Sequence, residues 1–210
     1  NFKIIFFSLF YLLSVLVWEP VIFYTPIFIA KEIIENNIEN FNLKFFKFLI
    51  AIFPGIIAAI FIAFNPISIE NHQIMESVLQ NEFNQNCYMS CELLKTKSSI
   101  LDQFRGNFGS YSFEVFLRYF FIIATGFGPI FLLLYNCELK NKNLLFLRHV
   151  SSPLYILLIC LVPVIFLFAM GYDWGRWVNI SYVFSAIFYF FFNKKKFFCI
   201  KLENSKEFYQ

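Results

Sequence analysis

Long blocks of apolar residues, separated by short polar segments, run through most of the chain. A helix needs about 20 mainly apolar residues to cross roughly 30 Å of hydrocarbon. Five blocks approach or exceed that length: residues 4–30, 45–64, 113–135, 153–172 and 177–192. The pattern predicts an all-α fold, a polytopic transmembrane helical bundle of about five spans that forms a single membrane domain over residues 1–210.

Prolines interrupt several of these blocks. The first block is too long for one straight crossing and contains Glu19-Pro20. It is therefore either one tilted, kinked helix or a shorter span followed by an interfacial segment. Because proline disfavours helix at the residue before it, we favour an interfacial position for Glu19, in the inner third of this block. Prolines inside the second, third and fourth blocks predict kinks: Pro54, Pro129 and Pro163.

The longest polar segment, residues 65–112, has an organisation of its own. Its apolar residues recur near helical spacing in two groups: Ile69, Ile74, Val78 and Leu79, then Leu93, Leu94, Ile100 and Leu101. This spacing predicts one or two short amphipathic helices that lie on the membrane or cap the bundle.

Basic residues predict the orientation of the bundle. They are concentrated in the short segment 136–152 and in Lys194-Lys195-Lys196 after the last block. Cytoplasmic segments carry the excess of lysine and arginine, and two spans separate these segments, so the two assignments agree. The tail 193–210 and the mixed-charge segment 31–44 are then cytoplasmic, whereas the loop 65–112 and the turn Asp173–Trp177 lie outside.

Composition agrees with a membrane location. The chain is 59% hydrophobic and 15% charged, against about 45–50% and about 25% in soluble domains. We predict an integral protein of the bacterial inner membrane. The 33 phenylalanines follow the codon bias of AT-rich genomes and do not indicate an aromatic binding surface. Since the chain begins at Asn1, we expect it to be a processed product or the C-terminal part of a longer protein.

Cys87 and Cys91 lie in the predicted outer loop, in a compartment where disulfides persist. Residues four apart on a helix are near the upper end of bridging distance, so both a disulfide and two unpaired cysteines stay open. We predict no metal site. His72 and His149 fall on opposite sides of the predicted membrane, and no second cysteine pair completes a four-ligand shell.

The turn after the fourth block carries an acid, an arginine and two tryptophans. Arg176 at a membrane rim can grip a phosphate or pyrophosphate in bidentate fashion, and Asp173 can orient it or act as a base. Trp174 and Trp177 can stack on a sugar ring. The alternative is an interfacial turn, in which the tryptophans belong to an aromatic belt and Asp173 pairs with Arg176.

A second acid–arginine pair begins the third block. Glu114 and Arg118 are four apart, so they share a helix face. Ionisable groups in membrane helices usually face the bundle interior or a water-filled cavity. The alternative is that Arg118 snorkels to the outer head groups and pairs with Glu114 there. Because both pairs fall at the outer end of a helix, we predict one shared polar cavity, with Asp173 and Glu114 as candidate catalytic acids.

The run Phe168-Ala-Met-Gly-Tyr-Asp-Trp-Gly-Arg-Trp177 resembles a stretch of bacterial multi-span proteins of cell-surface polysaccharide assembly, the class that includes O-antigen and exopolysaccharide polymerases. The resemblance covers this run alone, and that class has more spans. It implies that Arg176 and Asp173 hold a polyprenyl-pyrophosphate-linked glycan at the outer face. In an enzyme, the acid would activate an acceptor hydroxyl and the arginines would stabilise the leaving pyrophosphate.

Other readily recognised chemistries are missing from the sequence. It contains no P-loop, dinucleotide fingerprint, His-Glu-x-x-His or Ser/His/Asp arrangement. We therefore expect no cofactor and no nucleic-acid partner, and we expect membrane lipids as partners. The alternative function is a non-catalytic transporter or a structural subunit of a membrane complex, organelle-encoded respiratory subunits included. Kinked spans suit a transporter, whereas the fourth and fifth spans hold no ionisable residue at their centres.

Overall fold

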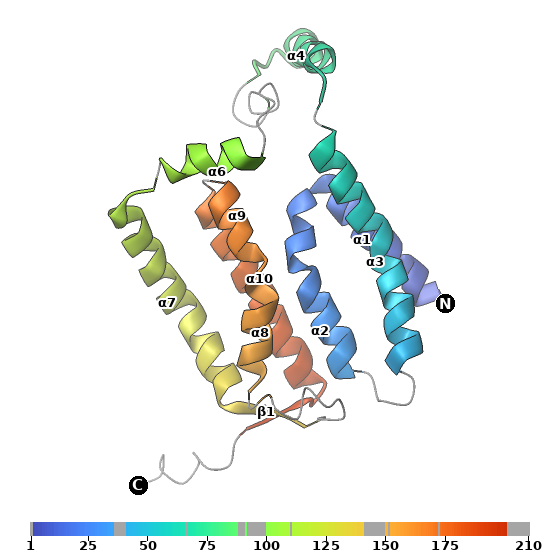
Figure 1. The fold of residues 1–210 in the computed structure, drawn as a ribbon, viewed down its shortest axis with the longest axis vertical. Helices are drawn as coiled ribbons and strands as arrows, with labels where there is room; N and C mark the ends of the chain where they lie inside the picture. Colours follow the sequence, from blue (N-terminus) through green and yellow to red (C-terminus); the bar gives the residue numbers. More distant parts are fainter. Residues whose placement is uncertain are drawn as a thin grey trace.

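The computed structural model describes residues 2–35, 41–65, 67–87, 91, 100–109, 111–140, 150, 152–171 and 173–200. In this part of the chain the regular structure is nearly all helical, which confirms the all-α class (Figure 1). The elements are, in order, α1 (Phe2–Val17), the 3-10 helix η1 (Glu19–Tyr24), α2 (Thr25–Glu35), α3 (Phe41–Phe64), α4 (Ile69–Phe83), α6 (Ile100–Phe108), α7 (Phe113–Tyr135), β1 (Cys137–Leu139), α8 (Pro153–Leu161), α9 (Val164–Met170), α10 (Trp174–Lys194) and β2 (Phe198–Ile200).

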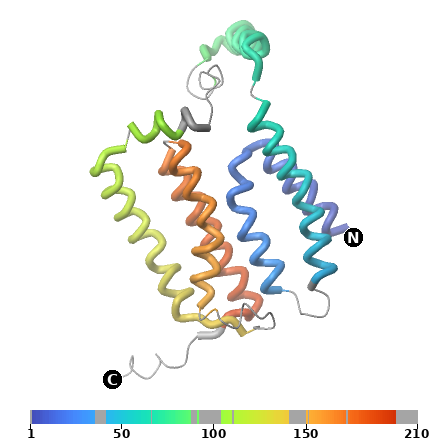
Figure 2. Tube along the Cα trace, viewed as in Figure 1, coloured from blue at the N-terminus to red at the C-terminus, as the bar shows by residue number. Residues whose placement is uncertain are grey.

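The long helices run side by side between two ends of the molecule (Figure 2). We call the end that carries η1, α6 and the start of α10 the upper end. The lower end carries the end of α2, the start of α3 and the two strands (Figure 1). α4 projects beyond the upper end of α3. This arrangement places the turn before α10 and the segment after α7 at opposite ends, as the predicted topology requires.

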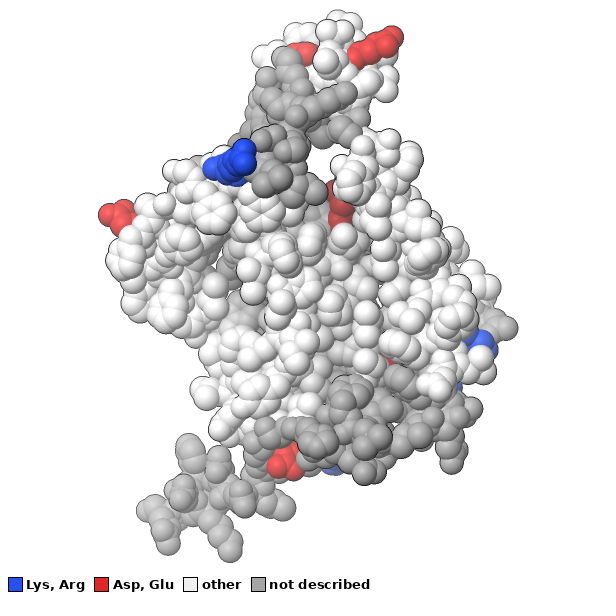
Figure 3. Space-filling view, in the orientation of Figure 1, with Lys and Arg blue, Asp and Glu red and all other residues white. Residues whose placement is uncertain are grey.

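Three helical segments are long and apolar enough to cross a membrane: Asn42–Phe64, Phe113–Tyr135 and Pro153–Met170. α1 is a shorter apolar helix. Large apolar side chains on these segments point outward, among them Phe61, Phe120 and Ile159. A soluble protein rarely exposes so much contiguous apolar surface. On the face drawn in Figure 3 the middle of the body carries little charge. The build suggests a membrane protein, but the described residues do not confirm five spans.

The first predicted block does not form one span. α1 ends at Val17, η1 turns the chain, and α2 runs back toward the lower end (Figure 1). Pro20 cannot continue the α1 helix, because it has no backbone N–H and its ring clashes with the carbonyl four residues earlier; it stands instead in the first turn of η1. The chain turns at Trp18, which is extended, with φ −155° and ψ 93°. α1 therefore ends just before Glu19, as the predicted interfacial position of this residue requires, but it ends at the upper end, whereas the prediction put Glu19 toward the inner side.

α1 and α3 pack closely around a small residue. A Cβ on Gly55 of α3 would lie 2.5 Å from the Tyr11 ring of α1, so this contact requires glycine. Small residues allow such close approach between membrane helices. The Tyr11 hydroxyl also shares a 2.5 Å hydrogen bond with Thr25 Oγ1, which joins α1 to α2. A second core cluster packs α2 against α8, α9 and α10.

A short antiparallel sheet closes the lower end. β1 pairs with β2 in the register Cys137↔Ile200, Glu138↔Cys199 and Leu139↔Phe198. The all-α prediction missed this sheet, because three-residue strands are too short to show a period-two pattern. The pairing places the segment after α7 and the segment after α10 side by side, at the same end of the molecule.

Helices form in the loop 65–112, where amphipathic helices are predicted. Ser68 caps α4 by accepting a hydrogen bond from the backbone N–H of Asn71, 3.2 Å away. α6 lies across the upper end of the bundle (Figure 1). The predicted apolar positions Leu93 and Leu94 lie outside the described residues.

Candidate functional site

The turn between α9 and α10 brings Asp173 and Arg176 together at the upper end. Arg176 Nε lies 2.9 Å from Asp173 Oδ2. Both side chains are open to the surroundings, with exposed fractions of 61% for Arg176 and 45% for Asp173. The backbone N–H groups of Arg176 and Trp177 donate to the Asp173 carbonyl, at 3.1 and 3.2 Å, so the first turn of α10 holds the pair in place.

The start of α10 favours an anion. The first backbone N–H groups of a helix have no intrahelical partner and carry the positive end of the helix dipole. An arginine in the same turn adds a full positive charge. The contact in this ion pair runs from Nε of Arg176 to Oδ2 of Asp173. An exposed ion pair contributes only about 0–1 kcal/mol, so an incoming phosphate can displace Asp173 at little cost.

Trp174 is buried beneath this turn. Its indole Nε1 donates to the Phe168 carbonyl of α9, 2.8 Å away. Aromatic rings from α7, from α9 and from the α6–α7 loop surround it, with centroids 4.9 to 5.7 Å from the indole: Tyr111, Phe116, Tyr119 and Phe168. In this arrangement the Trp174 ring anchors the turn and presents no open face to a sugar.

Trp177 is buried one turn further along α10. It stacks on Trp18, with 5.8 Å between ring centroids and 23° between planes. This contact fastens the α1–η1 junction to the start of α10. Among the described residues its Nε1 has no hydrogen-bond partner. As with Trp174, the burial of Trp177 gives no support to the predicted sugar-stacking role, nor does it match a lipid-facing belt.

α6 and the loop that follows it each supply one further side chain that braces the site. Tyr111, just after α6, donates its hydroxyl hydrogen to the Phe168 carbonyl, 2.6 Å away. Asn107 donates through Nδ2 to the Met170 carbonyl. These bonds satisfy carbonyls at the C-terminal end of α9, which lack partners within the helix. Sequence reasoning missed both residues, because they lie 57 and 63 positions from their partners and no local pattern marks them.

Glu114 and Arg118 lie in the first turns of α7, which Ser112 caps through the Val115 N–H. Both charged side chains are exposed. Tyr119, the residue after Arg118, packs against Trp174, so Arg118 points about 100° away from that contact. The structure brings both acid–arginine pairs to the upper end on neighbouring helices. Among the described residues no ion pair joins Glu114 to Arg118 or joins one pair to the other, and their shared cavity stays a prediction.

A separate cluster joins α4 to the cysteine pair. The structure bridges Cys87 and Cys91, with their Cα atoms 5.3 Å apart, which is within the ordinary disulfide range. His72 is only 2% exposed. Its Nε2 lies 2.9 Å from the Cys91 carbonyl oxygen and 3.6 Å from Cys87 Sγ. All three potential ligand atoms fall within 4.8 Å of one another.

This cluster corrects one premise of the sequence analysis. The sequence predicts no metal site, partly because His72 and His149 fall on opposite sides of the predicted membrane. His149 lies outside the described residues, and His72 contacts the cysteine pair directly. While the disulfide is intact, the sulfurs are not available as thiolates. Once reduced, they would form a Cys₂His set, which leaves a fourth position for water, as in open zinc sites.

No protein-family model, curated protein or solved structure matches this chain. The function is therefore inferred from the geometry of the site and from its place in the bundle.

Proposed function

We propose that the chain is an integral membrane protein that holds the phosphate or pyrophosphate of a lipid-linked sugar at Asp173 and Arg176. The observation that carries this proposal is the position of the pair. It is open to the surroundings, stands on the first turn of α10 and rests on a buried aromatic base. It also lies at one end of an apolar helical bundle, which would be the level of the lipid head groups if the bundle crosses a membrane.

The chemistry of the pair suits a phosphorylated ligand. The guanidinium fork matches two phosphate oxygens, which a lysine ammonium cannot do. The N-terminus of α10 adds backbone donors and a favourable dipole. When phosphate replaces it on Arg176, Asp173 is free to accept a proton from an acceptor hydroxyl. Arg176 would then stabilise the charge that develops on the leaving pyrophosphate during glycosyl transfer.

The proposed setting is surface-glycan assembly in a bacterial inner membrane, with the upper end outside and the C-terminus in the cytoplasm. Lysines gather at the lower end of the described chain, near the ends of α2, β1 and α10 and near the start of α3: Lys31, Lys44, Lys140, Lys194 and Lys195. The positive-inside rule places that end in the cytoplasm. The glycan assignment itself rests on the resemblance of residues 168–177.

A non-catalytic role in a transporter or a membrane complex is the second candidate. The observation in its favour is that both tryptophans of the motif serve internal packing, which gives residues 168–177 a structural purpose. α8 and α9 also form one helical segment that Pro163 interrupts, and kinked spans suit a transporter. The gene sequence upstream of Asn1 distinguishes the two candidate functions. Further membrane spans encoded there, together with neighbouring glycosyltransferase genes, would favour glycan assembly.

Substitution of Arg176 tests the proposal. Arg176→Lys keeps the charge but loses the fork, so we expect binding of a polyprenyl-pyrophosphate sugar to weaken about tenfold, the equivalent of about one charge-assisted hydrogen bond. Arg176→Ala should weaken it further. Arg105→Lys is the matched control, because Arg105 is an exposed arginine of α6 outside the pair. The measurement is binding to the purified protein in nanodiscs, with surface-glycan output at matched protein levels.

Asp173→Asn separates binding from transfer. Removal of the carboxylate charge should leave phosphate binding equal or stronger, whereas glycan output should fall because the proposed base is lost. If Arg176→Lys binds as well as the unsubstituted chain, Arg176 is only an interfacial anchor, because both side chains snorkel equally well.

A further inference from the structure

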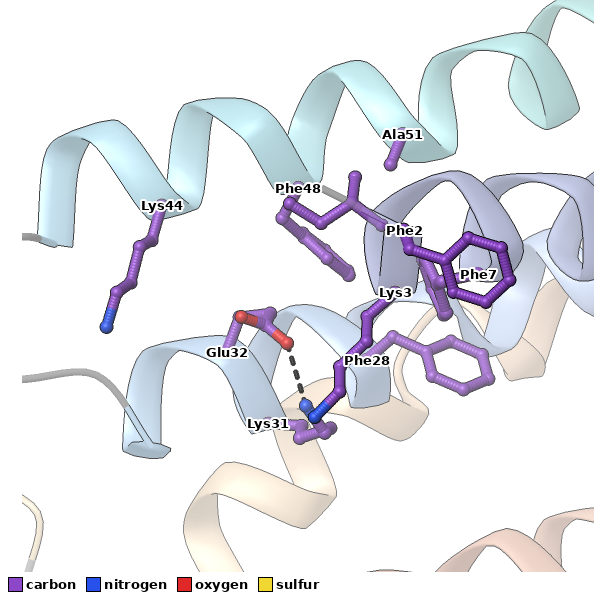
Figure 4. Close-up of a pocket in the computed structure, with 10 residues that line it drawn as sticks. Phe2, Lys3, Phe7, Phe28, Lys31, Glu32, Lys44, Phe48 and Ala51 are labelled. Atoms are coloured by element: carbon purple, nitrogen blue, oxygen red, sulfur yellow. Dashed lines mark hydrogen bonds and ion pairs between the residues drawn. The ribbon is translucent and has the colours of Figure 1, made fainter.

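A cavity of about 740 Å³ opens at the lower end between α1, α2 and α3. Its walls are mainly apolar, and its charged residues are three lysines, one from each helix, and one glutamate (Figure 4). The lining residues used below are Lys3 and Phe7 of α1, Phe28, Lys31 and Glu32 of α2, and Lys44, Phe48 and Ala51 of α3. The cavity lies at the opposite end from Asp173 and Arg176.

The charge of this cavity is unbalanced. Lys31 is neutralised within α2, because its Nζ lies 2.7 Å from Glu32 Oε1 and 2.9 Å from Glu35 Oε2. Lys3 and Lys44 are both exposed, and neither joins an ion pair with another described residue. Two positive charges on different helices therefore flank the same opening with no ion-pair partner in the described part of the chain.

The apolar wall is fixed by aromatic contacts. The Phe7 ring stacks on Phe48 at 5.4 Å and meets the edge of Phe28 at 6.0 Å. Phe48 and Ala51 are buried. A free phosphate ion would gain nothing from such a wall, and a zwitterionic lipid would gain less from the lysines than an anionic one, because its ammonium group is repelled. The combination matches an amphiphile with an anionic head and a hydrocarbon chain.

We propose that this cavity binds an anionic phospholipid, with an acyl chain against Phe7, Phe28 and Phe48 and the phosphate between Lys3 and Lys44. Lysine binds phosphate as a point charge and needs no fixed geometry. Basic pockets between membrane helices on the cytoplasmic side hold anionic head groups. The site shares no residue with the proposed lipid-linked sugar site, so either assignment can fail without the other.

The test is lipid retention by the full chain, measured by native mass spectrometry after exchange into detergent with phosphatidylglycerol or phosphatidylcholine. We expect phosphatidylglycerol to be retained at least about tenfold better, which corresponds to about 1.4 kcal/mol. Lys3→Gln with Lys44→Gln should abolish the preference. Both lysines are exposed, so the double variant should fold normally.

The matched control is Lys47→Gln with Lys194→Gln. Lys47 is exposed on α3 three residues after Lys44, Lys194 ends α10, and neither lines the cavity. This control removes the same charge from the same end. If the control variant still retains phosphatidylglycerol better than phosphatidylcholine, the result supports the proposed site. If both double variants lose this preference, the lipid is held by general electrostatic attraction and the proposed site is overturned.

Ala51→Phe tests the acyl-chain part. The added ring fills the cavity without a change of charge, so phosphatidylglycerol retention should fall; unchanged retention would contradict the proposal. Competition with inorganic phosphate identifies the source of the phosphate. Displacement of the lipid by inorganic phosphate alone would show that the lysines form a simple anion site and would overturn the lipid assignment.

Discussion

Trp174 and Trp177 are buried three residues apart on α10, but only Trp174 has a hydrogen-bond partner among the described residues. Trp174→Phe removes that bond, which is worth about 1 kcal/mol, whereas Trp177→Phe removes a buried N–H that has no such partner. We therefore expect Trp174→Phe to lower the free energy of unfolding by about 1 kcal/mol more than Trp177→Phe. Equilibrium unfolding in detergent micelles measures the difference. Equal losses would mean that Trp177 Nε1 donates to a group such as a bound water.

The surroundings of Cys87 and Cys91 predict a dependence on redox state. In protein from an oxidising compartment, mass spectrometry of alkylated, unreduced samples should show the two cysteines linked. After reduction by a dithiol, we expect the chain to bind Zn²⁺ through Cys87, Cys91 and His72, with release of the thiol protons. His72→Ala leaves two ligands and should weaken zinc affinity at least about tenfold. Free thiols in the oxidised sample, or zinc binding indifferent to His72, would contradict these expectations.

At the scale of single residues, the charged residues of the candidate site could be predicted from the sequence, but the residues that hold them in place could not. Asp173 and Arg176 could be found because charges stand out in an apolar chain and lie three positions apart. Asn107, Tyr111 and the His72 contact could not be found, because each depends on residues distant in the chain. Burial of the two tryptophans was equally invisible, since a belt and a core use the same residue type.

Among the elements, the α1–α3 contact depends on Gly55. In a helix interior, alanine is more favourable than glycine by about 1 kcal/mol when space permits. Gly126 of α7 has that space, since nothing lies within 4 Å of an added Cβ, so Gly126→Ala should be neutral or stabilising. Gly55→Ala would place Cβ 2.5 Å from the Tyr11 ring, and overpacking should cost about 1–3 kcal/mol. The measurement is the thermal unfolding temperature of the two variants. Equal stability of Gly55→Ala and Gly126→Ala would contradict the close packing of α1 on α3.

Block length and apolar content were sufficient to predict most helices, as α3, α7 and the α8–α9 segment show. They could not distinguish a kink from a hairpin at Glu19-Pro20, because apolar residues continue on both sides of the break. Contacts with other elements favour the hairpin: Tyr11 bonds to Thr25, and Trp18 stacks on Trp177. Such contacts leave no periodic signal in the chain.

At the scale of the whole molecule, the hairpin changes the predicted topology. A single span over residues 4–30 would put the start of α1 at the end opposite to the C-terminus. In the structure, the α1–α2 turn reaches the upper end, and α2 returns to the lower end (Figure 1). Each of α1 and α2 is shorter than a standard span, at 16 and 11 residues.

Accessibility measurements test this topology in cells. Glu19→Cys should react with a membrane-impermeant maleimide from outside, beyond the signal of the unsubstituted chain, because η1 lies at the upper end. Lys140→Cys should react only after permeabilisation. Reporter fusions after Phe192 and within residues 138–148 should give internal signals. An external signal at either fusion would reverse the orientation, and an unreactive Glu19→Cys would restore a single first span.

The strand pairing at the lower end also constrains how the protein is made. Synthesis proceeds from the N-terminus, so β1 is complete before α8 begins, and β2 leaves the ribosome after the last helix. Until then β1 has an unpaired edge, which is a template for association with other chains. The two strands can pair only if α8, α9 and α10 are arranged so that β2 reaches the lower end of the molecule, where β1 lies. Closure of the sheet therefore depends on the completed packing of α8, α9 and α10.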